Sequence, residues 1–205
     1  MKQSNDANTE EKIKIAARVV FHKKGFAATR TRDIAEEAGI NLALLNYYFR
    51  SKEKLFELIM IETLTGFLQN MGLVFNSETT TLNEKIQLVA ERYIDHFMAE
   101  PDTPLFVMSE IRSHGAELFQ NMPTVNTILQ SAFVKQYKEA VKNGKIMEPN
   151  PLHFLMNLMS LMAFPFIGSP IIKKIGKLTD RQFEKLMQER KKMIPIWMNA
   201  MFNAV

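Results

Sequence analysis

Two helix-start signals lie ten residues apart with a glycine between them, and this spacing constrains the fold more than any other feature of the chain. Thr31 and Asn41 can each accept a backbone N–H in the first turn of a helix, and Gly39 can adopt the left-handed conformation that ends one. The sequence therefore predicts a helix over 32–38 and another over 42–49. Joined by only three residues, they must turn sharply, as in a helix-turn-helix.

The rest of the chain is also helical in pattern. Apolar residues recur at intervals of three and four, and the prolines and glycines fall mostly between these runs. This predicts an all-α fold in which a first helix ends at Gly25. We expect further helices over 53–76, 82–99, 104–120, 123–143, 151–164 and 180–203, divided into a three-helix head at 1–52 and a larger helical body at 53–205.

The excess positive charge lies in the first quarter of the chain. Residues 1–56 hold eleven lysines and arginines against seven acidic residues, whereas the remaining residues hold fifteen of each kind. A basic module on a neutral body is typical of proteins that bind an anionic partner. Because the second helix of a helix-turn-helix can enter the major groove, we predict that the partner is double-stranded DNA.

The outward positions of the second helix would meet the DNA. Asn46 is suited to a bidentate hydrogen bond with adenine, and short apolar side chains beside it could contact a thymine methyl group. Hydroxyl groups and lysines are better suited to phosphates, which set register without reading sequence. The predicted DNA contacts are Thr31, Asn41, Leu42, Ala43, Leu44, Asn46, Tyr47, Tyr48 and Lys52.

The segment IAEEAGINLALLNYYFRSKEKLF resembles the DNA-binding signature of the tetracycline-repressor-like (TetR) transcriptional regulators. The resemblance covers about residues 9–56, and its matching positions are Ile34-Ala35, Ala38-Gly39, Leu45, Tyr48-Phe49 and 51–56. It implies a homodimer with a three-helix DNA-binding head and an all-helical body that binds an inducer and loosens the DNA.

Family roles can be carried over only to the matching positions. They make Tyr47, Tyr48 and Lys52 contacts to the DNA backbone and place Ala43 close to the groove. Many family members carry a lysine or small polar residue in place of Leu42, threonine in place of Leu44 and tyrosine in place of Asn46. The recognition face is therefore unusually apolar, and the operator sequence does not follow from relatives.

The body is rich in methionine and phenylalanine, and thirteen of the fourteen methionines follow residue 56. Ligand pockets between helices are mostly apolar with a few polar groups that orient the ligand, although plain core packing would explain the same apolar residues. A buried Arg112 without an acidic partner would indicate an anionic ligand. The residues predicted to bind an effector are Phe67, Met71, Tyr93, His96, Phe97, Met108, Arg112, His114, Phe133, Tyr137 and Met159.

The last helix carries an apolar stripe at helical spacing, and the helix over 151–164 has no charge. Together they could form a four-helix interface between two subunits. The alternative is that both stripes face the core of their own chain. The residues predicted for the dimer interface are Phe154, Phe183, Met187, Arg190, Ile194, Trp197 and Met201.

Several other classes of protein fit poorly. The chain has no cysteine, and its four histidines are dispersed with no pair four residues apart, so we expect no metal, no cofactor and no enzyme. The charge-free stretch over 149–172 is interrupted by prolines and falls short of the roughly twenty residues of a membrane span. With no apolar leader at the N-terminus, the cytoplasm is the expected location.

These features together predict a homodimeric DNA-binding transcriptional regulator. We expect a repressor that a small apolar or amphipathic ligand releases from a palindromic operator. The alternative is a helical carrier of a lipid-like or heme-like molecule whose basic head is incidental. Salt separates the two hypotheses, because only DNA binding weakens steeply as salt rises.

Overall fold

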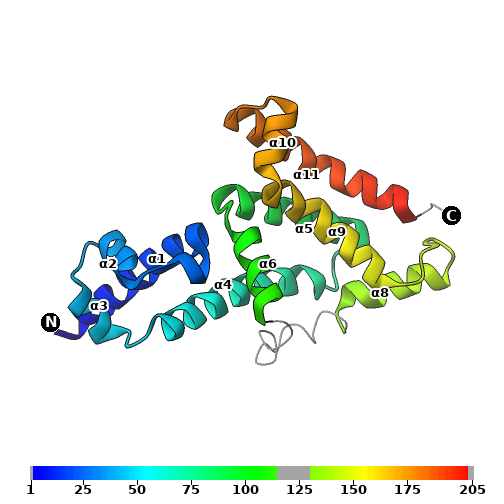
Figure 1. Cartoon of the computed structure of the whole chain (residues 1–205). Coiled ribbons are helices and arrows are strands. Elements are labelled where there is room, and N and C mark those ends of the chain that lie inside the picture. Colours follow the sequence, from blue (N-terminus) through cyan, green and yellow to red (C-terminus); the bar gives the residue numbers. More distant parts are fainter. Residues whose placement is uncertain (1, 115–129, 203–205) are drawn as a thin grey trace. The chain divides into compact units, whose positions relative to one another are not determined.

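The computed structural model describes residues 2–114 and 130–202, which form helices and no strand (Figure 1). This confirms the all-α prediction. The described residues fall into two compact units, one of 2–66 with 105–114 and the other of 67–104 with 130–202. The units divide inside α4 (Lys52–Phe75), so the functional boundary expected at residue 52 stays a prediction.

The first unit contains α1 (Lys2–Ala28), α2 (Thr31–Ala38), α3 (Leu42–Tyr48), the start of α4 and most of α6 (Thr103–His114). Ion pairs join α1 to α4, because the carboxylate of Glu62 accepts from Lys14 Nζ at 2.7 Å and from Arg18 Nη2 at 3.0 Å. Beside them, the Phe21 and Phe56 rings meet edge to face with centroids 4.9 Å apart. Charge and aromatic packing therefore hold α1 against α4.

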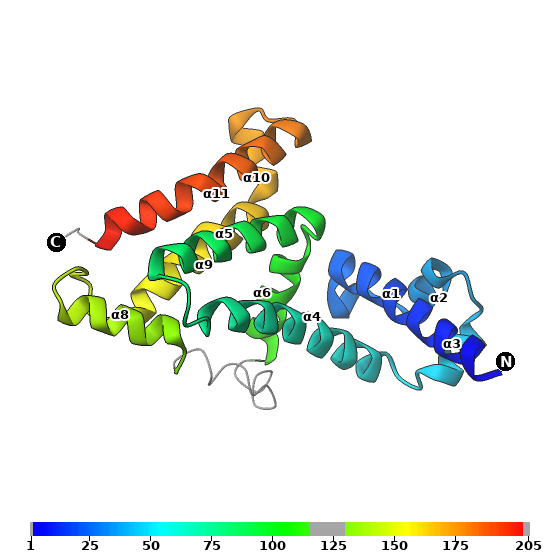
Figure 2. The same ribbon diagram turned by 180° about the vertical axis from the view of Figure 1, so that it is seen from behind.

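The second unit contains the end of α4 together with α5 (Leu82–Ala99), α8 (Ala132–Lys142), α9 (Pro151–Ile167), α10 (Ser169–Gly176) and α11 (Asp180–Phe202). Its central helix is α5, which packs on α8, α9 and α11 (Figures 1 and 2). Thr81 and Glu84 cap its N-terminus, with the Glu84 carboxylate accepting from the Thr81 N–H at 2.7 Å. The apolar faces of these helices form one core.

The glycine at position 25 interrupts α1 as predicted. Gly25 has a φ of 69°, and the chain resumes a short helical stretch that ends at Ala28. Thr29 follows and is buried, with its Oγ1 donating to the Gly25 carbonyl at 2.7 Å. The first unit therefore has a corner at 25–30 that leads directly into α2.

The helix predicted over 123–143 does not include residues 130 and 131. Ser131 caps α8, because its Oγ accepts from the Val134 N–H at 3.4 Å, and residue 130 is a turn. The helix predicted over 123–143 therefore begins only at Ala132 within the part of the chain that is described. Residues 123–129, like 115–120 of the helix predicted before it, lie outside the described residues.

The helix predicted to stop at residue 164 instead continues through a proline. Pro165 has no N–H, so the Leu161 carbonyl loses its partner within α9. Arg190 Nε of α11 donates to that carbonyl at 2.8 Å, which satisfies it from outside the helix. After Ile167 the chain bends by 72° into α10, a helix that the sequence analysis did not predict.

By length and composition, α4 is apolar enough to cross a membrane, and α9 with α10 would qualify only as a bent pair. Leu55 and Ile59 of α4 are buried in the first unit, and Val74 and Phe75 are buried in the second. A helix that supplies core residues in this way needs many apolar positions. The hydropathy of α4 is thus accounted for by the cores that it helps to form.

Candidate nucleic-acid interface

The turn between α2 and α3 depends on Gly39. This residue ends α2 in the left-handed conformation, with φ 61° and ψ 39°. Its N–H donates to the Glu36 carbonyl at 3.0 Å, and the Ile40 N–H donates to the Ala35 carbonyl at 3.0 Å. These two bonds satisfy the last carbonyls of α2 within a three-residue connection, which confirms the predicted sharp turn.

The start of α2 differs by one residue from the prediction. Arg30 occupies the cap position and Thr31 is the first helical residue, so the predicted cap at Thr31 is wrong. Asp33 provides the cap bond instead, accepting from the Arg30 N–H at 3.0 Å, and it pairs with Lys24 of α1 at 3.1 Å. The Arg30 bond, followed by the Lys24 bond, lowers the pKa of the Asp33 carboxyl.

Thr31 nevertheless lies in the first turn of α2. Backbone N–H groups at a helix start attract phosphate, so its predicted contact with the DNA backbone stays a prediction. Asn41 caps α3 as expected, because its Oδ1 accepts from the Leu44 N–H at 2.8 Å. That bond leaves the Asn41 amide nitrogen as a donor at the edge of the turn.

Helix α3 has one inner residue and a broad outer face. Leu45 is 1% exposed, whereas Ala43, Asn46 and Tyr47 are exposed. The Tyr48 ring is half-buried and meets Tyr47 edge to face, with centroids 5.3 Å apart. Leu45 therefore anchors the helix while the polar edge of Asn46 and the adjacent small and aromatic side chains point outward.

The exposed positive charges of this unit lie outside α3. Helix α3 carries no charged residue, and Arg30, Arg32, Arg50 and Lys54 of the same unit are exposed. Protein–DNA interfaces divide their contacts in this way, with cations on phosphates and polar or apolar groups on base edges. The unit thus has the chemistry of a major-groove reader.

Lys52, another predicted phosphate contact, is held inside the unit. Its Nζ donates to the Phe26 and Thr29 carbonyls at 3.0 Å each and lies 4.1 Å from the centroid of the Phe26 ring. An ammonium has three donors, and two of them are used here. Its contact with phosphate stays a prediction.

The residues predicted to bind an effector are absent from the lining of the hollow described in the next paragraph, and their role in ligand binding stays a prediction. Arg112 is exposed, so the condition set for an anionic ligand is not met. The side chains of Phe67 and His114 lie outside the described residues. Of the others, Met71, Tyr93, Phe97, Phe133 and Tyr137 are buried in the core, His96 and Met159 are half-buried, and Met108 is exposed.

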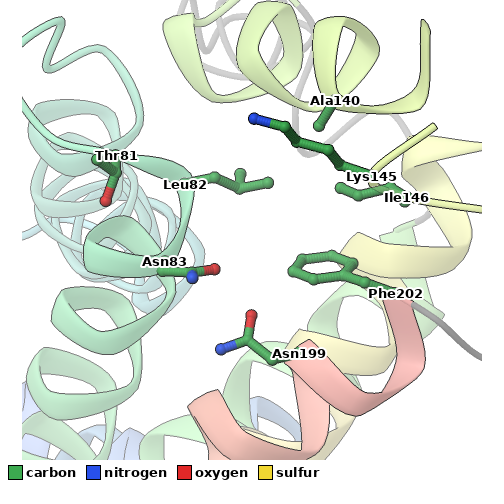
Figure 3. Close-up of a pocket in the computed structure, with 8 residues that line it drawn as sticks. All are labelled: Thr81, Leu82, Asn83, Ala140, Lys145, Ile146, Asn199 and Phe202. Atoms are coloured by element: carbon green, nitrogen blue, oxygen red, sulfur yellow. The ribbon is translucent and has the colours of Figure 1, made fainter. Parts of the chain in front are cut away.

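A hollow of about 540 Å³ lies elsewhere in the second unit (Figure 3). It opens between the start of α5, the end of α8 with the loop after it, and the end of α11. Figure 3 shows Asn83, Asn199 and Phe202 pointing into it. Its remaining lining residues are Thr81, Leu82, Ala140, Lys145 and Ile146. Only tertiary packing joins these distant segments, so no local pattern could have revealed them.

The stripe predicted to contact a second subunit is divided between the core and the surface. Phe154, Phe183, Met187 and Ile194 are buried in the core of the second unit, which favours for these four residues the alternative that they face the core of their own chain. Of the other three, Arg190 and Trp197 are half-buried and Met201 is exposed. The exposed apolar residues of α9 and α11 are Leu152, Met156, Phe164, Leu186, Met193, Ile196 and Met201.

A helix-turn-helix with an outward recognition helix on a helical body defines a class of DNA-binding regulator. Residues 15–59 match the model of the bacterial regulatory proteins of the tetR family. The chain is also 25% identical over 199 residues to the probable HTH-type transcriptional regulator YttP of Bacillus subtilis strain 168, across 95% of this chain and 94% of YttP. The chain thus resembles transcriptional regulators of the tetR family, through its helix-turn-helix region and through its likeness to YttP.

Solved structures share the fold over almost the whole chain. SCO4942 of Streptomyces coelicolor matches with a TM-score of 0.66 at 21% identity, over 95% of this chain and 98% of SCO4942. FadR of Bacillus subtilis, solved with stearoyl-CoA, matches with a TM-score of 0.58 at 19% identity, over 90% of this chain and 96% of the FadR chain. No group of three histidine or acidic residues within 2–114 and 130–202 could hold a metal ion.

Proposed function

We propose that this chain is a homodimeric repressor that reads a palindromic operator with α3. The observation that supports this most strongly is the arrangement of α3 itself. Its only buried side chain is that of Leu45, while Ala43, Asn46 and Tyr47 are exposed in a unit that also exposes basic residues. A helix anchored by one residue can present its opposite face to base edges.

Different side chains of the first unit suit different parts of the DNA. The amide of Asn46 can donate an N–H to the N7 atom of adenine while its carbonyl oxygen accepts from the N6 amino group. Ala43 and Leu44 are exposed apolar groups that suit a thymine methyl. Arg30, Arg32 and Arg50 supply phosphate contacts, which give affinity without sequence preference. The operator should therefore contain an A·T pair at a fixed place in each half-site.

The homodimer part of the proposal rests on the surface of the second unit. Exposed apolar side chains on α9 and α11 include Met156 at 57%, Phe164 at 60% and Ile196 at 58% exposure. Apolar surface of this kind marks protein interfaces. A two-fold dimer would place two α3 helices against half-sites about 34 Å apart, or a multiple of that spacing.

The release step needs an effector in the body. The hollow beside Asn83 and Phe202 combines apolar walls with amide groups and Lys145 at its edge, which suits an amphipathic molecule. FadR, which shares the fold, was solved with the amphipathic ligand stearoyl-CoA. A ligand that prefers a body conformation with mis-spaced heads lowers operator affinity by population shift.

Selection of random duplexes by the purified protein tests the proposal. We expect a two-fold symmetric winner whose log affinity falls linearly with log salt, with a slope of about −0.9 per phosphate contacted. Asn46→Ala should lose the preference at one A·T position of each half-site and keep most of the binding to random DNA. Saturable, salt-insensitive binding of an apolar ligand with no enriched duplex would favour the carrier hypothesis instead.

A further inference from the structure

The corner between α1 and α2 is held by a lysine from α4. Residues 26–29 follow the break at Gly25, and a chain that leaves a helix exposes carbonyls without helical partners. Lys52 Nζ donates to two carbonyls of this corner at 3.0 Å each, that of Thr29 and that of Phe26, which also accepts from the Thr29 N–H at 3.3 Å. A single ammonium therefore connects the first residue of α4 to the end of α1.

The same lysine shares an aromatic ring with a second residue of α4. Lys52 Nζ lies 4.1 Å from the centroid of the Phe26 ring. The centroid of the Phe56 ring lies 4.7 Å from the same Phe26 centroid. Residues 52 and 56 are one helical turn apart and share a face of α4. The Phe26 ring therefore contacts both the Lys52 ammonium and the Phe56 ring, which share one face of α4.

This corner determines where α2 begins. Thr29 is buried at 2% exposure, donates through Oγ1 to the Gly25 carbonyl, and offers its own carbonyl to Lys52. The next residue, Arg30, is the cap of α2. A shift of the Thr29 carbonyl therefore displaces the helix-turn-helix that begins beside it.

We infer that Lys52 is a positioning residue whose main effect on operator binding passes through the Gly25–Arg30 corner rather than through a phosphate. The inference rests on the proposed function. Two of the three ammonium donors are already bonded inside the unit. Exposed cations such as Arg50 and Lys54 lie within two residues of Lys52 and carry charge toward solvent.

The absence of cysteine from the sequence permits a direct chemical test. A Lys52→Cys variant can be alkylated at its single thiol with 2-bromoethylamine, which rebuilds an ammonium of nearly the length of lysine. The same thiol can instead receive a trimethylammonium-ethyl group, which has the same charge but no N–H. Only the first product can donate to the Phe26 and Thr29 carbonyls.

Two quantities are measured for each product: operator affinity and, without DNA, the hydrogen-exchange protection of the Thr29 and Arg30 amides. We expect the ethylammonium form to restore both quantities and the trimethylammonium form to restore neither. Recovery of affinity by the trimethylammonium form would overturn the inference. So would recovery of affinity by the ethylammonium form while the amides stay as unprotected as in Lys52→Cys.

Salt dependence provides an independent comparison. Lys52→Gln should weaken operator binding about tenfold, since hydrogen bonds from a charged group are lost, with an unchanged salt slope. The matched control is Lys54→Gln, which removes an exposed charge from the same turn and should leave amide protection unchanged. If the salt slope of operator binding instead becomes shallower by about 0.9 for each Lys52 replaced, and the corner amides stay protected, Lys52 contacts a phosphate and the inference is overturned.

Failure of the inference and failure of the proposed function have different signatures. If the unsubstituted protein selects no duplex, the proposed function fails, whatever Lys52 does. If the unsubstituted protein binds its operator but Lys52→Gln leaves the corner amides protected, the positioning role fails alone. The exchange measurement needs no DNA, so it decides the role of Lys52 at the corner in either case.

Discussion

Replacing Arg190 tests how α9 stays helical across Pro165. Its Nε donates to the Leu161 carbonyl at 2.8 Å, and its guanidinium lies 4.9 Å from the Trp197 ring centroid. Pro165 cannot donate to that carbonyl, so Arg190→Met leaves it without its partner while keeping much of the aliphatic volume. Losing a hydrogen bond from a charged donor costs about 1.5–3 kcal/mol, and the cation–π contact adds roughly 0.5–1 kcal/mol.

The assay is urea unfolding at one fixed protein concentration, because dimerisation would otherwise shift the apparent stability. We expect a lower midpoint with an unchanged m-value, corresponding to a loss of about 2–4 kcal/mol in the free energy of unfolding. The matched control is Lys192→Met on the exposed face of α11, which should change stability by less than about 0.5 kcal/mol.

A double-mutant cycle isolates the proline. Pro165→Ala restores an N–H that can donate to the Leu161 carbonyl within α9. In that background Arg190→Met should cost about 1 kcal/mol less than it does in the unsubstituted protein, because the carbonyl keeps a partner. Strictly additive effects would refute the reasoning, since they would mean that Arg190 and Pro165 do not act on the same carbonyl.

Three further predictions concern the helix-turn-helix. Gly39→Ala should destabilise the protein by about 1–2 kcal/mol in thermal unfolding, because a side chain is strained at φ 61°; an unchanged midpoint would contradict the role given to this turn. Asn41→Ala should cost about 1 kcal/mol by removing the acceptor for the Leu44 N–H, and Asn41→Ser should restore most of it; equal losses in both variants would exclude capping as the cause. Bonds from Arg30 and then Lys24 lower the pKa of the Asp33 carboxyl from its ordinary value, so its stabilising contribution is present above the unfolded pKa of about 3.9 and is lost as pH falls through the lower, folded pKa. Unfolding free energy measured from pH 5 to pH 2.5 should therefore fall less for Asp33→Asn than for the unsubstituted protein, and parallel curves would count against this linkage.

The parts of the fold that follow from the sequence are those set by neighbouring residues. Gly39 and Asn41 act within one turn of their own positions, so their residue types sufficed to predict the turn and the start of α3. The bounds of α5 match the predicted 82–99, and Thr81 with Glu84 caps its start. Such caps are local chemistry and need no knowledge of the tertiary structure.

The parts that could not be predicted depend on contacts between distant segments. Pro165 is a strong stop signal taken alone, and only Arg190 explains why α9 continues to Ile167. Helical periodicity in α11 likewise identifies an apolar stripe but not what covers it. Met187 proved to be a core residue, whereas Ile196 is exposed on the same helix.

The candidate interface shows the same division. The exposed residues of α3 follow from its short length and from the single inward position at Leu45. The function of Lys52 inside the unit does not, because the Phe26 and Thr29 carbonyls approach it only once α1 has broken and turned. A sequence pattern can indicate that a lysine lies near DNA, but it does not show whether its hydrogen bonds go to phosphate or to its own chain.

The central claim is that α3 reads base pairs, and Asn46 tests it most directly. The measurement is the affinity of the unsubstituted protein and of Asn46→Ala for the selected operator, for every single-base variant of it, and for random DNA. We predict that Asn46→Ala loses about 1–3 kcal/mol of discrimination at one A·T position of each half-site and keeps the others. An equal loss on the operator, on all variants and on random DNA would contradict the account.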